Sequence, residues 1–135
     1  IKLMDSGLPQ KASEHLKKRL YELADKHICI GDVRGVGHFW ALEIVKNRKT
    51  KEPFDTKPDK FSGKALMTGK ISGDAMQNGL YLSIWYDTLV ITPPLIITED
   101  QIDEAIAILD KSLEIADKEA VETDVVASRS CEYTK

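Results

Sequence analysis

The order of the predicted elements indicates an α+β fold, a two-layer sandwich with helices on one face of a small, mostly antiparallel sheet. Apolar residues recur every three or four positions in three separate stretches, which is the period of an amphipathic helix. Between these stretches lie two pairs of short runs that favour strands. The predicted order is therefore helix, two strands, helix, two strands, helix.

The first helix is predicted over residues 9–27. Pro9 suits its first turn, because the missing N–H of a proline costs nothing there. Two strands follow over residues 28–33 and 38–45, and residues 34–37 form the glycine-rich turn between them. The apolar face of the helix consists of Ala12, Leu16, Leu20 and Leu23.

Residues 47–60 carry many charges and two prolines, and they are predicted to form an exposed loop. A helix is predicted over residues 61–77, although three glycines each cost roughly 1 kcal/mol relative to alanine in a helix interior. The pair Asn78 and Gly79 is a stop signal, since both residues tolerate a left-handed backbone. Two short strands are predicted over residues 80–85 and 89–92.

The last helix has the clearest start in the sequence. Thr98 is a natural N-cap, Gln101 completes a capping box, and Ile97 can pack against Ile102 across the helix entrance. After Ala120 the apolar pattern fades. The apolar stripe of this helix consists of Ile102, Ala105, Ile106, Leu109, Leu113 and Ala116.

Composition indicates one globular domain, predicted over residues 1–120, and a tail over residues 121–135. Of 135 residues, 42% are hydrophobic and 30% are charged, and the net charge is only -3 with both signs interspersed. These values argue against nucleic-acid and membrane-surface partners. No apolar run approaches the ~20 residues that span a bilayer. Cys29 and Cys131 have no Cys or His at metal-ligand spacing, which favours free thiols in a reducing cytoplasm.

Candidate chemistry from the residues alone is sparse, and no metal site is predicted. The turn at Gly35 and Gly37 exposes backbone N–H groups that suit an anion, but it joins two strands and does not open a helix, so a tight turn is the favoured interpretation. Arg34 is either an anion clamp or a structural arginine. Glu43 lacks a partner for general-base chemistry. Trp85, at a strand end, fits either packing or contact with a ligand.

Three segments resemble the C-terminal small domain of class III (omega-amino acid) aminotransferases. Residues 31–43 contain the Arg-Gly-x-Gly element, residues 49–53 read Lys-Thr-Lys-Glu-Pro, and residues 92–99 contain Pro-Pro-Leu. The resemblance extends over residues 8–118. It implies the C-terminal domain of a fold-type I enzyme that uses pyridoxal phosphate to move an amino group from an amine or omega-amino acid to a keto acid.

The resemblance also implies where the chemistry lies. In this family the lysine that forms the Schiff base, and most of the cofactor pocket, belong to a large domain outside this sequence. No catalytic or cofactor-binding residue is therefore assigned to the chain, and the chain alone is expected to be inactive. The implied partners are its own large domain and a second subunit of a cytoplasmic homodimer. The alternative is a free-standing small α+β binding or regulatory module that shares only the order of elements.

The resemblance implies three residues of the substrate cleft, Ser83, Trp85 and Val90. In the family, the segment before Pro93 borders the mouth of the active site and often carries an arginine that holds the substrate carboxylate. Ser83 and Val90 stand at the two positions where different branches place that arginine. The chain therefore departs from both the 4-aminobutyrate-type and the diaminopelargonate-type patterns, and the substrate is left open.

Overall fold

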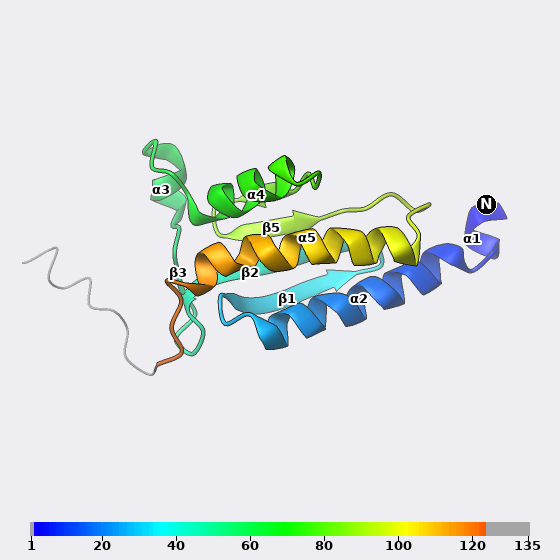
Figure 1. The fold of residues 1–135 in the computed structure, drawn as a ribbon, viewed down its shortest axis with the longest axis horizontal. Helices are drawn as coiled ribbons and strands as arrows, with labels where there is room; N and C mark the ends of the chain where they lie inside the picture. The colour runs from blue at the N-terminus through cyan, green and yellow to red at the C-terminus, as the bar shows by residue number, and fades with distance from the viewer. Residues whose placement is uncertain (1, 124–135) are drawn as a thin grey trace, which may run out of the picture.

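The computed structural model describes residues 2–123, and it confirms the α+β class with helices packed on an antiparallel sheet (Figure 1). The predicted order of the main helices and strands is also confirmed. The elements are α1 Lys2–Asp5, α2 Leu8–Lys26, β1 Ile30–Val36, β2 Phe39–Asn47, β3 Glu52–Pro53, α3 Lys57–Phe61, α4 Met67–Gln77, β4 Ser83–Trp85, β5 Thr88–Ile91 and α5 Glu99–Asp117.

The main sheet has the strand order β1-β2-β5-β4, and each neighbouring pair is antiparallel. The short strand β3 pairs with the end of β2. Strand β2 is therefore central, and its side chains alternate between the two faces of the sheet. Its residues Trp40, Leu42 and Ile44 are almost fully buried. These three side chains mark the face on which the helices pack.

Helices α2, α4 and α5 cover that one face, and Figure 1 shows them in front of the strands. Helix α5 packs against both α2 and α4, so it is the middle helix of the layer. The core lies between the two layers. Its largest fully buried apolar side chains are Leu20, Ile30, Leu42, Ile44, Val45, Ile71, Leu89, Ile102, Leu109 and Leu113.

The predicted start of α5 is confirmed in detail. The Thr98 hydroxyl accepts a hydrogen bond from the Gln101 backbone N–H at 3.2 Å, and the Gln101 side chain accepts one from the Thr98 N–H at 3.1 Å. This capping box pairs two backbone donors that a helix start leaves free.

The predicted helix over residues 61–77 is wrong at its start, because α4 begins only at Met67 and Phe61 is the last residue of a separate helix, α3. Thr56 and Asp59 make a capping box that begins α3 inside the predicted loop. Gly63 then takes a left-handed backbone with φ of 81° and ends the helical path. The buried Asp55 carboxylate accepts hydrogen bonds from the N–H groups of Met67 and Thr68, at 2.9 and 3.1 Å, and so begins α4.

The start of the predicted tail contacts the sheet. The Val121 N–H donates to the Lys46 carbonyl at 2.7 Å, and the Arg48 N–H donates to the Val121 carbonyl at 2.9 Å. Cys29 is a buried free thiol, whereas Cys131 lies outside the described residues. Within residues 2–123, no helix has the length and apolar character that a membrane span requires.

We expect Gly35→Ala to destabilise the isolated chain by about 1–3 kcal/mol, the usual cost of overpacking. A Cβ at Gly35 would lie 2.4 Å from the Phe39 carbonyl oxygen and 2.5 Å from the Trp40 ring. The matched control is Gly73→Ala inside α4, where a Cβ meets nothing within 4 Å. That control should stabilise by roughly 0.5–1 kcal/mol through helix propensity. Urea unfolding checks both changes, and equal stabilities for the two variants would contradict the packing of this turn.

Candidate functional site

The face of the sheet opposite the helices brings the three predicted cleft residues together. Ser83 on β4 and Val90 on β5 are direct cross-strand partners, and Trp85 lies two residues along β4 from Ser83. Directly paired residues point to the same side of an antiparallel sheet. We call this side the open face. Its residues are Asp32, Arg34 and Val36 on β1, Phe39, Ala41 and Glu43 on β2, Ser83 and Trp85 on β4, and Thr88 and Val90 on β5.

Large apolar side chains lie exposed on the open face. The exposed fractions are 79% for Val36, 61% for Phe39 and 53% for Trp85. Uncovered aromatic and aliphatic side chains that gather on one surface mark an interface or a ligand-binding region. The open face is therefore the strongest candidate for the functional surface within residues 2–123.

Arg34 lies in the same row of the open face as Val90 and Ser83, but two acids balance its charge. Its guanidinium is 3.4 Å from the Asp32 carboxylate and 3.7 Å from the Glu43 carboxylate. These are loose, largely exposed ion pairs, which contribute little stability. The geometry favours the structural interpretation of Arg34 over an anion clamp.

A second cation reaches the open face from a different element. Helix α3 holds the Lys60 ammonium 3.6 Å from the centroid of the Trp85 ring, within the range of a cation–π contact. The Tyr86 ring lies beside Trp85, with centroids 6.1 Å apart. Sequence reasoning missed Lys60, because nothing local in residues 57–61 indicates that α3 folds back onto β4.

A separate apolar cavity of about 260 Å³ lies where β4 begins and β5 ends. Ser83 and Val90 are among its lining residues and Trp85 is not. The remaining lining residues are almost all aliphatic and come mainly from α5, the start of β4 and the Pro93–Pro94 segment. The cavity thus joins one edge of the open face to the helical layer.

The glycine-rich turn makes room for the Trp40 side chain. Strand β1 continues through Val36, so the turn is shorter than predicted. Gly37 has a left-handed backbone with φ of 59°, and its carbonyl accepts a hydrogen bond from the Trp40 indole N–H at 2.8 Å. Because the Trp40 ring occupies the space beside Gly35, this turn offers no phosphate cradle.

Comparison with known proteins decides the family. A family model described as aminotransferase class-III matches residues 6–113. The chain belongs to this family. It is 40% identical over 104 residues to putrescine–pyruvate aminotransferase of Pseudomonas aeruginosa, covering 77% of this chain and 21% of that protein. It is 39% identical over 103 residues to taurine–pyruvate aminotransferase of Bilophila wadsworthia, covering 76% and 22%.

Other similar proteins extend the comparison. An ethanolamine-phosphate phospho-lyase homolog of Caenorhabditis elegans is 35% identical over 111 residues, covering 81% of this chain and 22% of that protein. The solved aminotransferase from Vibrio fluvialis in its PMP-bound form superposes with a TM-score of 0.72 at 31% identity, covering 87% of this chain and 25% of that one. The chain therefore spans about a fifth to a quarter of the length of the relatives it matches.

The class III family depends on pyridoxal phosphate, but neither the apolar cavity nor the glycine-rich turn has the groups that would hold that cofactor. A bound pyridoxal phosphate needs a lysine beside its ring, an acid for the pyridine nitrogen and a phosphate cradle. The lining of the apolar cavity contains no lysine and no acid, and the glycine-rich turn is filled by Trp40.

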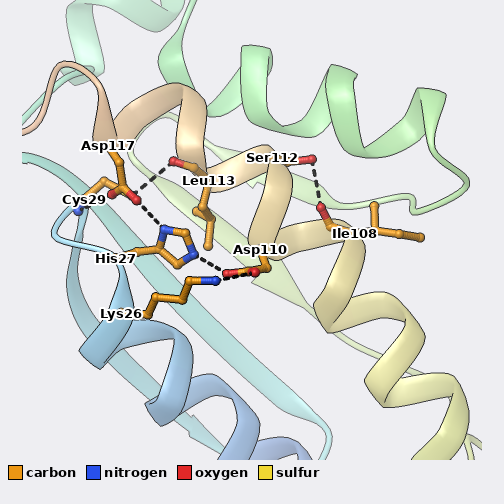
Figure 2. A network of polar contacts seen from close by, with 8 residues as sticks. All are labelled: Lys26, His27, Cys29, Ile108, Asp110, Ser112, Leu113 and Asp117. Atoms are coloured by element: carbon orange, nitrogen blue, oxygen red, sulfur yellow. Dashed lines mark hydrogen bonds and ion pairs between the residues drawn. The ribbon is translucent and has the colours of Figure 1, made fainter.

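A polar cluster joins the C-terminal end of α2 to the C-terminal half of α5 (Figure 2). The His27 ring is 1% exposed, and its Nδ1 and Nε2 atoms each contact a carboxylate, from Asp117 and Asp110 respectively. Both ring nitrogens of His27 therefore face carboxylate oxygens, which are hydrogen-bond acceptors when ionised. The Lys26 ammonium also contacts Asp110, at 2.6 Å.

The thiol beside this cluster is unreactive. Asp117 accepts a hydrogen bond from the Cys29 backbone N–H at 3.1 Å. Burial, followed by the contact with Asp117, raises the pKa of the Cys29 thiol far above its ordinary value. A buried thiol that keeps its proton is a poor nucleophile. The cluster is a structural clamp that ties the end of α2 and the start of β1 to α5, and no metal-binding group of three or more His, Cys, Asp or Glu occurs within residues 2–123.

We expect Asp110→Asn to lower stability at pH 7 by roughly 1.5 kcal/mol, because it weakens the hydrogen bonds to Lys26 and His27. Burial alone would raise the pKa of Asp110, but the Lys26 and His27 contacts outweigh it and the pKa lies below its ordinary value. A lowered carboxyl pKa stabilises the fold above the unfolded value, near 3.8, and that contribution is lost as pH falls through the folded pKa.

Urea unfolding across a pH series from 7 to 2 checks this expectation, with Glu104→Gln on the exposed side of α5 as the control. The difference between wild type and Asp110→Asn should shrink below about pH 4, while Glu104→Gln should stay close to wild type throughout. A difference that is constant with pH would contradict the ionised clamp.

Proposed function

We propose that this chain is the C-terminal closing domain of a class III aminotransferase, which transfers an amino group from an amine or omega-amino acid to a keto acid. In the complete enzyme the open face forms part of the substrate cleft wall, with Ser83, Trp85 and Val90 lining it. The chain alone supplies no cofactor site and is inactive.

The observation that carries the proposal is the family match over residues 6–113 together with its short span of the relatives. A domain that represents about a fifth of a family enzyme needs the remainder to assemble an active site. The exposed apolar side chains of the open face support such a role, since they call for a covering surface. Pyridoxal phosphate would be held by the large domain, and a second subunit would complete a cytoplasmic homodimer.

The substrate class follows from what the cleft residues lack. With Ser83 and Val90 in place of arginines, no guanidinium at these two positions can hold a substrate carboxylate. The relatives are named for donors with no acid group, such as putrescine, and for donors with a sulfonate, such as taurine. We therefore propose small aliphatic amines and omega-amino acids as donors, with pyruvate as the acceptor.

The test compares the transaminase activity and cofactor binding of the full-length protein with those of this chain. With pyridoxal phosphate and pyruvate, the full-length protein should form alanine from an amine donor and bind the cofactor stoichiometrically. The chain alone should do neither. Release of phosphate from ethanolamine phosphate without alanine formation would instead indicate a lyase. A gene whose reading frame begins near Ile1 would favour the free-standing binding or regulatory module.

We expect Ser83→Arg or Val90→Arg in the full-length enzyme to shift preference toward carboxylate-bearing donors. Because the two positions are direct cross-strand partners, either arginine reaches the same part of the open face. A charge-assisted hydrogen bond contributes about 1.5–3 kcal/mol, or tenfold or more in relative kcat/KM. Steady-state kinetics with β-alanine and n-propylamine checks the shift. An unchanged kcat/KM ratio in both variants would remove these residues from the cleft.

A further inference from the structure

Lys60 is the cation on the open face whose charge no acid balances within the part of the chain described. Its ammonium lies 3.6 Å from the Trp85 ring centroid and 5.8 Å from the Phe61 ring centroid, so its neighbours are aromatic. The Lys60 side chain is half-buried. An ammonium has three N–H donors, and the Trp85 ring occupies only one side of it. The other donors can bind an incoming acceptor.

The acids nearest to Lys60 are committed to other partners. The Asp59 carboxylate accepts hydrogen bonds from the backbone N–H and the hydroxyl of Thr56, both at 2.8 Å, and lies 3.6 Å from Lys64. Across the open face, Asp32 and Glu43 both pair with Arg34. The positive charge of Arg34 is thus balanced and that of Lys60 is not.

The position of Lys60 is fixed by the fold and not by a long mobile loop. The capping box of Thr56 and Asp59 begins α3 four residues before Lys60. The buried Asp55 ties the preceding segment to the start of α4 through two backbone N–H groups. A cation held between two anchored helix starts is preorganised for binding.

Trp85, the residue that Lys60 contacts, lies near Ser83 on β4. Trp85 and Ser83 are two residues apart on β4 and point to the same side, which separates their Cα atoms by about 7 Å. A donor whose carboxylate or sulfonate accepts a hydrogen bond from the Lys60 ammonium would therefore lie on the same part of the open face as the β4 residues. The Trp85 ring provides an apolar surface beside the ammonium.

We propose that Lys60, held over Trp85, binds the anionic group of an omega-amino acid donor, a carboxylate or a sulfonate. This subsite takes the place of the arginine that is missing at Ser83 and Val90. It makes the enzyme selective for donors with an acid at the far end of the carbon chain over unsubstituted alkyl amines. The proposal rests on the aminotransferase function proposed above.

The experiment measures kcat and KM of the full-length enzyme with two matched pairs of donors. Taurine and β-alanine carry the anion, whereas n-propylamine and n-butylamine do not. Lys60→Gln should raise KM for the anionic donors and lower their kcat/KM tenfold or more, with less than a twofold change for the alkyl amines. Lys60→Arg keeps the charge and the ring contact and should retain most of the preference.

Lys64→Gln is the matched control, because Lys64 is an exposed lysine that follows the same helix and pairs with Asp59. It should leave all four donors unchanged. An equal loss for anionic and alkyl donors in Lys60→Gln, or no loss at all, would overturn the subsite. If Lys60→Gln does not fold, two other measurements decide the question. The first is the donor preference of Lys60→Arg, and the second is competition by propane-1-sulfonate against n-propylamine in the wild-type enzyme. Absence of competition overturns the proposal. Failure of the wild-type enzyme to transaminate any donor would instead refute the proposed function.

Discussion

Strand β2 presents one face to the core and the other to the open side of the sheet, and the rest of the structure depends on this constraint. Trp40, Leu42 and Ile44 enter the core, while Phe39, Ala41 and Glu43 point to the open face. Because side chains alternate along the strand from Phe39 to Ile44, a shift of register by one residue would exchange the two sets. Strands β1, β3 and β5 all pair with β2, so its register determines which residues of the neighbouring strands reach each face.

This arrangement separates the packed face of the sheet from the open face. The helical layer buries the apolar side chains on one face, and the clamp of His27 by Asp110 and Asp117 ties the layer to the turn before β1. The open face carries no helix of the main layer and holds instead exposed apolar side chains, a balanced arginine and the Lys60–Trp85 pair. A face built in this way is suited to meet another surface or a substrate.

The features that the sequence predicted correctly are those with local causes. The capping box of Thr98 and Gln101 lies within four residues, and β2 is predicted from the aromatic and β-branched residues of its own segment. The clustering of Ser83 and Val90 also follows from two short strands joined by a tight turn.

The missed features depend on contacts between distant segments. The division between α3 and α4 requires the buried Asp55 to cap a helix twelve residues later. The two carboxylates around His27 come from α5, and Lys60 meets Trp85 only because α3 folds against β4. No local pattern signals such partners, since their residue types are ordinary for exposed helix positions.

The central claim is that the open face is covered in the complete enzyme, and hydroxyl-radical footprinting read by mass spectrometry tests it most directly. In the isolated chain, Trp85 and Phe39 should react readily, because they are 53% and 61% exposed, whereas Trp40, at 3%, should be protected. In the full-length protein, the account predicts that Trp85 and Phe39 become several-fold less reactive while Trp40 stays protected. Equal reactivity of Trp85 and Phe39 in the two proteins would contradict the account.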